Sequence, residues 1–165
     1  LLREDNVRTG FFEPEQYEAL LAHLPEGMRP VVTFAYVTGW RINSEVLPIQ
    51  WRQVDLRVGE VRLDPGTTKN REGRVFYLTS ELHQLLKEQR AAADEIQRQK
   101  NMIVQHVFFH RPVTRAGVPG HRAGQSISDC GFYQAWRRAR TAAGCPGSDP
   151  GEQSGEHPHG LGLVG

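Results

Sequence analysis

The chain of 165 residues has a formal net charge of +1 at pH 7, with 24% charged and 38% hydrophobic residues. This balance is ordinary for one globular domain and excludes a strongly basic protein, so any affinity for nucleic acid must come from local clusters. The two cysteines exclude a disulfide framework and suit a reducing cytoplasm, and no apolar run is long enough to span a membrane.

The first segments in chain order are a polar stretch and three helices. Residues 1–10 are expected to form a linker, and the first helix is expected to begin near Pro14, because proline is tolerated in a first turn. Its apolar stripe, at helical spacing, consists of Tyr17, Leu20, Leu21 and Leu24. A second helix over residues 29–37 is nearly all apolar and therefore central. A third helix is expected over residues 42–49, limited by Pro48.

The middle of the chain predicts a small sheet. Residues 58–63 alternate between apolar and polar side chains, as one strand does. Residues 67–69 and 74–78 flank a turn that ends in Gly73, and the β-branched and aromatic residues of the second arm favour a hairpin. Together these segments predict three antiparallel strands.

The second half of the chain returns to helices. A hydroxyl cap at Thr79 opens a helix whose polar extension, residues 89–101, is expected to lie in solvent. Residues 104–110 predict a strand or a buried extended stretch, and the residues 111–125 predict a loop rich in glycine, proline and arginine. A last helix is expected over residues 128–143, and its core stripe consists of Phe132, Trp136 and Ala139.

These elements indicate an α+β protein, mostly helical, with its helices packed around a small three-stranded antiparallel sheet. The domain is expected to cover residues 11–143. Residues 144–165 are rich in glycine and proline with little to bury, so they predict a flexible tail.

The stretch 38–47 stands out between two apolar helical patterns. Gly39 is typical of the residue just past a helix end, where positive φ is easily adopted by glycine. Arg41 follows at once, and its guanidinium must face a polar group, for which phosphate and carboxylate are the natural choices. Two interpretations stay open at this point: a structural ion pair, for example with Glu45, and a phosphate clamp.

The motif Thr38-Gly39-Trp40-Arg41, followed by an apolar-acidic helix start, resembles the first catalytic-arginine motif of the tyrosine recombinases, or phage-type integrases. The similarity extends from about Phe11 to Gly144. It includes, in the order and spacing of that family, the residues 51–56, 67–70 and 132–139.

The resemblance implies roles for several residues. Arg41 corresponds to the first phosphate-binding arginine, and Lys69 to the hairpin lysine that reaches the DNA minor groove and protonates the leaving 5′ oxygen. The alternative for Lys69 is an ordinary hairpin-tip lysine. Glu45 is a possible site residue, although it lies four positions after the arginine and the family usually places its acid three after it. Lys69, Arg71 and Arg74 form a basic cluster expected to bind double-stranded DNA.

The C-terminal part departs from the family pattern. His159 is a possible match for the histidine of the family's His-x-x-Arg pair, but Gly162 stands where the arginine belongs. No tyrosine corresponds to the nucleophile. The expectation is therefore a C-terminally truncated recombinase catalytic domain that is inactive as it stands, with a tail that arises from a frameshift or a fusion.

The sequence allows two other interpretations. A non-catalytic DNA-binding or regulatory relic, pairing with itself or with an intact recombinase, is compatible with the basic hairpin and with a second basic cluster at Arg137, Arg138 and Arg140. A metal site at His157 and His159 is disfavoured, because no further ligand lies nearby in the sequence. We therefore expect no metal and no cofactor.

Overall fold

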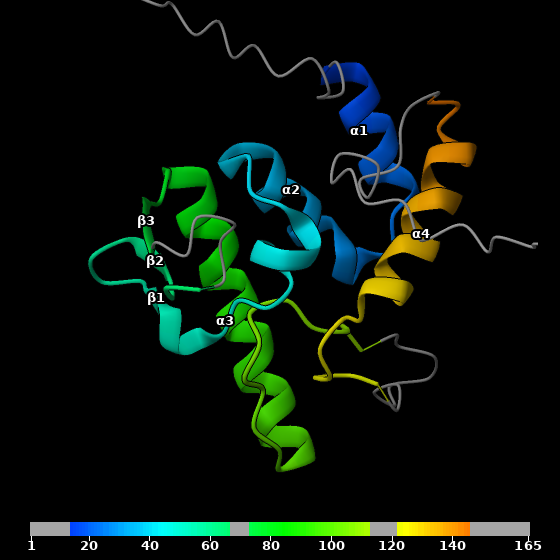
Figure 1. The fold of residues 1–165 in the computed structure, drawn as a ribbon. Helices are drawn as coiled ribbons and strands as arrows, with labels where there is room; N and C mark the ends of the chain where they lie inside the picture. The colour runs from blue at the N-terminus through cyan, green and yellow to red at the C-terminus, as the bar shows by residue number, and fades with distance from the viewer. Residues whose placement is uncertain (1–13, 67–72, 113–121, 146–165) are drawn as a thin grey trace, which may run out of the picture.

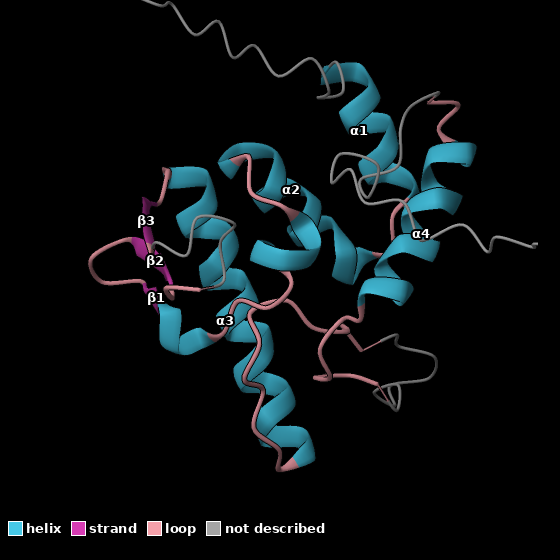
Figure 2. Cartoon of the chain, in the orientation of Figure 1, coloured by secondary structure: helices cyan, strands magenta, loops and turns pink. Residues whose placement is uncertain are grey.

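The computed structural model describes residues 14–66, 73–112 and 122–145, which form a mostly helical α+β fold (Figure 1, Figure 2). The main helices are α1 (Pro14–His23), α2 (Arg29–Thr38), α3 (Ser80–Lys100) and α4 (Asp129–Ala142). Short helical turns are η1 (Glu26–Met28), η2 (Ile42–Val46) and η3 (Trp51–Gln53). The strands β1 (Val54–Asp55), β2 (Glu60–Leu63) and β3 (Arg74–Tyr77) form one antiparallel sheet in that order. The predicted fold class is confirmed.

The first two helices supply one side of the core. Of the predicted stripe, Leu20 on α1 and Leu24 just after its end are buried, and the hydroxyl of the half-buried Tyr17 donates to Thr33 of α2 at 2.9 Å. Helix α2 follows the predicted span almost residue for residue, and it buries Val31, Val32, Phe34 and Ala35. Figure 1 shows α1 beside α4, so the first and last described helices close the same side of the molecule.

The turn after α2 contains the predicted glycine, and the helix that follows the turn is shorter than predicted. Gly39 has φ 69° and ψ 14°, and its N–H donates to the carbonyl of Ala35, which confirms its place at the helix end. The predicted helix over residues 42–49 is too long, because η2 ends at Val46. Pro48 has no N–H with which to continue the helical hydrogen bonds.

The sheet has the predicted number of strands, but its members differ from the prediction. β2 pairs with β1 on one side and with β3 on the other, where Val61 lies opposite Phe76. The strand predicted from Val58 begins at Glu60, because residues 56–59 form a turn. A strand of two residues such as β1 has no alternation of apolar and polar side chains, so the sequence pattern does not predict it. The predicted hairpin arm at residues 67–69 lies outside the described residues.

We expect Asp55→Asn to lower stability at neutral pH and to have no effect in acid. The Asp55 carboxylate accepts the N–H groups of Val58 at 3.1 Å and Arg57 at 2.9 Å, and these bonds lower the pKa of Asp55 below its ordinary 3.8. Because the folded pKa lies below the unfolded pKa, the stabilisation is present above about pH 4 and is lost as pH falls through the folded pKa. Thermal unfolding followed by circular dichroism across this range measures the difference, and a gap that persists in acid would contradict the expectation.

Helix α3 begins where it was predicted to begin, but its second half has a buried face that was not predicted. The Thr79 hydroxyl accepts the N–H of Leu82, which caps its first turn. The predicted solvent exposure of residues 89–101 is wrong for one face, because Gln89, Ala93 and Ile96 are buried. The chain returns along this face: the Gln89 amide donates to the carbonyl of Val107, which is itself buried.

The return segment is the buried extended stretch predicted over residues 104–110. Val104, Val107, Phe108 and Phe109 are all buried. Two isolated bridges, Gln50 with His106 and Phe109 with Ser126, hold the segment in place. The predicted core stripe of α4 is confirmed, and the side chain of Ser128 accepts the N–H of Gly131 at the start of that helix. Within the three described ranges, no helix is both long enough and apolar enough to cross a membrane.

Candidate nucleic-acid interface

Arg41 leaves the core at the end of α2 with its side chain exposed. The preceding residue, Trp40, is only 8% exposed. Its ring meets Phe34 of α2 edge to face at 5.7 Å and Phe76 of β3 at 5.8 Å between centroids. These two ring contacts hold Trp40 in place and so fix the backbone next to Arg41. The Arg41 guanidinium has no hydrogen-bond or ion-pair partner among residues 14–66, 73–112 and 122–145.

Glu45 is the buried acid of this turn, with 5% of its surface exposed. One carboxylate oxygen, Oε2, accepts the backbone N–H of Arg41 at 2.8 Å. The other, Oε1, lies 3.6 Å from a guanidinium nitrogen of Arg74, the first residue of β3. The ion pair of Glu45 is therefore with Arg74, and its contact with Arg41 is to the backbone. Among the described residues, Glu45 therefore leaves the guanidinium of the exposed Arg41 without an acidic partner.

The geometry of η2 explains how Glu45 reaches Arg41 from four positions away. The N–H groups of Val46 and Leu47 donate to the carbonyls of Arg41 and Ile42, five residues back, at 3.0 Å and 2.8 Å. This is the hydrogen bonding of a π-turn, which accommodates one more residue than an α-turn and is frequent at functional sites. The wider turn places the carboxylate of Glu45 over the N–H of Arg41.

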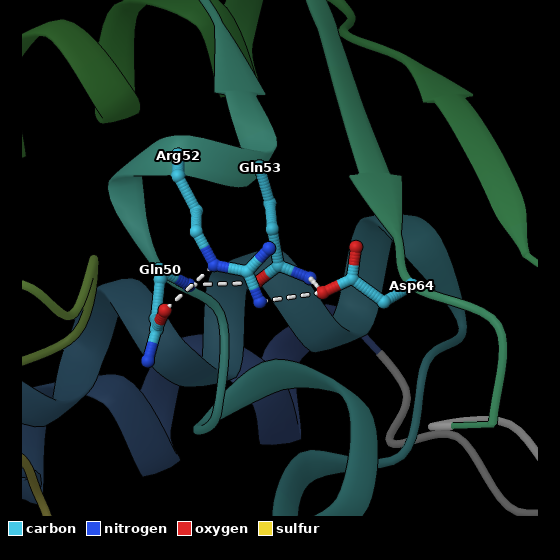
Figure 3. Close-up of polar contacts among 4 residues, drawn as sticks. All are labelled: Gln50, Arg52, Gln53 and Asp64. Carbon is cyan, nitrogen blue, oxygen red and sulfur yellow. Dashed lines mark hydrogen bonds and ion pairs between the residues drawn. The ribbon is translucent and has the colours of Figure 1, made fainter.

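A second polar cluster holds the start of the β2–β3 connection (Figure 3). Asp64 follows β2, and its Oδ2 accepts a guanidinium N–H of Arg52 at 2.6 Å and the amide of Gln53 at 3.3 Å. The Nε of Arg52 also donates to Gln50 at 2.9 Å. The backbone N–H of Gln50 donates to the side chain of Gln53, and this hydrogen bond caps the start of η3. The cluster fixes Asp64 against η3.

The predicted site residues divide into two groups. The structure brings together Arg41, just before η2, Glu45 on η2 and Arg74 on β3. Lys69, Arg71 and His159 lie outside the described residues. The connection that contains Lys69 runs from Asp64, held by Arg52 and Gln53, to Arg74, held by Glu45. The basic residues of α4 form no part of this group, because Figure 1 shows α4 and the sheet on opposite sides of α2.

Sequence reasoning missed the cluster around Asp64. Residues 51–56 belong to the family pattern, which by itself predicts no role for Arg52 or Gln53. The available signal was the pair Gln50 and Gln53, whose spacing suits a reciprocal cap of a short helical turn. The partner Asp64 is eleven residues further on and has no such local signature.

Two comparisons bear on the identity of this arrangement. A family model described as the phage integrase family matches residues 10–161. The matched range contains the turn with Arg41, the three strands and α4, and it continues through His159. A search of curated proteins returns no match. The resemblance inferred from the Thr-Gly-x-Arg motif and the segments after it is confirmed.

Proposed function

The chain belongs to the phage integrase family, whose proteins act in DNA integration and recombination, and we propose from this premise that Arg41 binds a backbone phosphate of double-stranded DNA. The observation that carries the proposal is the arrangement of charge at η2. A buried carboxylate orders the backbone of Arg41 and neutralises a different arginine, so the exposed Arg41 guanidinium keeps its positive charge available to a ligand.

Arginine suits this task for a chemical reason. Its planar guanidinium presents several N–H donors in a fixed fork that matches two oxygens of one phosphate. In phosphoryl transfer, negative charge grows on these oxygens, and donors held in advance at that position stabilise it. The Trp40 ring contacts and the Glu45 cap would hold Arg41 in this way before DNA binds.

Lys69 is proposed as the acid that protonates the leaving 5′ oxygen, and Arg71 as a further contact to the DNA backbone. Support comes from the two ends of their connection. Asp64 is fixed by Arg52 at one end, and Arg74 pairs with Glu45 at the other. The second end, Arg74, therefore lies at the same carboxylate that caps Arg41, and this supports a role for Lys69 and Arg71 at the proposed phosphate site.

We further propose that these 165 residues bind DNA without cleaving it by themselves. No histidine among them is followed three positions later by arginine. Three of the described tyrosines lie at least partly in the packing of the helices: Tyr17 and Tyr36 stack with ring centroids 4.3 Å apart between α1 and α2, and Tyr133 lies half-buried on α4. Tyr77, 73% exposed, lies on β3 in a structural part of the family pattern. Such a protein would occupy recombination sites alone, or beside another copy or an intact recombinase.

Titration of the full chain with a labelled duplex at several salt concentrations tests the proposal. Binding through a few phosphates should weaken steadily with salt, with a slope of log affinity against log salt of about −0.9 for each phosphate neutralised. A suicide substrate tests cleavage in parallel, and no covalent adduct is expected. A duplex affinity that does not depend on salt, or no affinity, would contradict the phosphate site. A covalent protein–DNA adduct would contradict only the absence of cleavage.

A further inference from the structure

Glu45 joins two elements that are distant in the sequence. Its side chain is 6% exposed, and its two oxygens point to different partners, the N–H of Arg41 and the guanidinium of Arg74. A buried carboxylate is costly unless its charge is compensated and its oxygens are bonded. Arg74 supplies the opposing charge, and the N–H of Arg41 supplies a hydrogen bond that is strengthened by the charge of the acceptor.

We propose that Arg74 is a positioning residue that holds Glu45 against the N–H of Arg41 and so fixes the direction in which the Arg41 side chain leaves the turn. In this role Arg74 affects DNA binding through Glu45, and it does not neutralise a phosphate of its own. The part of this inference that concerns DNA rests on the proposed function, whereas the part that concerns Arg41 and Glu45 does not.

The surroundings of Arg74 support this assignment. Its side chain is 47% exposed, so about half of it is committed to protein contacts. It shares one face of β3 with Phe76, since alternate residues of a strand point the same way, and Phe76 contacts Trp40. Two neighbouring side chains of β3 therefore contact the residues on both sides of the Arg41 backbone, Trp40 before it and Glu45 after it.

Arg62 offers a matched control on the adjacent strand. It also pairs with a buried glutamate, Glu60, and its side chain is 67% exposed. It lies opposite Val75, on the face of the sheet away from Trp40. Arg62→Ala therefore removes the same charge and a similar ion pair from the same sheet, without touching Glu45.

The first test is amide hydrogen exchange of the full chain, measured by NMR in the absence of DNA. Arg74→Ala should speed exchange at the Arg41 amide by about fivefold, because a partly exposed ion pair that restrains its acceptor is lost. The amide of Phe132, in α4, is the control for a general loss of stability, which would speed exchange at both amides. Its exchange rate should not change. Arg74→Lys should restore slow exchange at Arg41, and Arg62→Ala should leave it unchanged. Unaltered exchange at Arg41 in Arg74→Ala would overturn the proposal.

The second test is the salt dependence of duplex binding by the same variants. Arg74→Ala should weaken binding severalfold without changing the salt slope, and the loss should disappear when Glu45→Gln is already present. A slope reduced by about one unit would make Arg74 a direct phosphate contact and overturn the proposal. If the wild type binds no duplex, the phosphate site fails, and amide exchange alone decides whether Arg74 positions Glu45.

Discussion

Arg41→Ala is expected to lower the affinity for duplex DNA by about tenfold or more, because one charge-assisted contact to phosphate is lost. The melting temperature should stay within about 2 °C of the wild type, since the guanidinium is exposed and has no partner in the described part of the chain. Arg41→Lys should recover only part of the affinity, because an ammonium group lacks the planar fork. Fluorescence anisotropy with a labelled duplex, at fixed salt, measures all three proteins.

The control for this prediction is Arg138→Ala on α4. Arg138 is also exposed, and its helix lies across α2 from the sheet, so the variant removes the same charge at a distance from Arg41. Its affinity should fall by no more than about twofold, as expected for a general electrostatic effect. Equal losses in Arg41→Ala and Arg138→Ala would mean that only net charge matters and would refute a specific site.

Phe34→Ala should have the largest effect on stability, with a loss of about 3–5 kcal/mol in the free energy of unfolding. Phe34 is fully buried on α2 and meets two other rings edge to face, Trp40 at 5.7 Å and Phe108 at 5.6 Å between centroids. Its removal leaves a cavity at the centre of the core and takes away one of the two rings that hold Trp40. Urea unfolding followed by tryptophan fluorescence gives the free energy.

Phe34→Leu is expected to cost clearly less, because it keeps most of the buried volume. The exposed control is Ile103→Ala, since Ile103 is 78% exposed and its truncation should stay within about 0.5 kcal/mol of the wild type. A loss below about 1 kcal/mol for Phe34→Ala would contradict the prediction, because it would show that the core collapses around the missing ring and leaves little cavity.

Much of the fold was predictable because its signals are local. The apolar spacing of α1 and α4, the nearly all-apolar α2 and the hydroxyl cap at Thr79 are each contained within a few residues. The left-handed residue Gly39 belongs to the same class, since a helix end requires a conformation that few residues adopt as readily.

The features that escaped prediction depend on partners far along the chain. The polar second half of α3 looks solvated until residues 104–109 fold back on it and bury Ala93 and Ile96. β1 is too short to carry a pattern, and it exists because β2 lies beside it.

The sequence predicted which residues are candidates for the site, but it did not predict which of them contact one another. The Thr-Gly-x-Arg motif located Arg41 and drew attention to Glu45, but spacing alone left the position of the acid unexplained. The π-turn brings the Glu45 carboxylate to the N–H of Arg41 through backbone hydrogen bonds that a residue pattern does not predict, and the role of Glu45 at the site stays a prediction. The pairing of Glu45 with Arg74 is likewise a consequence of how β3 packs against η2.

The buried amide of Gln89 has a consequence for how this chain tolerates changes in length. The extended segment beside α3 has few backbone pairings, and the Gln89 side chain joins the carbonyl of Val107 to the guanidinium of Arg111 at 2.6 Å. One side chain thus bonds to both ends of the five-residue segment from Val107 to Arg111 and fixes its length. An insertion before Val104 can be absorbed in the turn after α3, whereas one between Val107 and Arg111 would leave an uncompensated polar group in the interior.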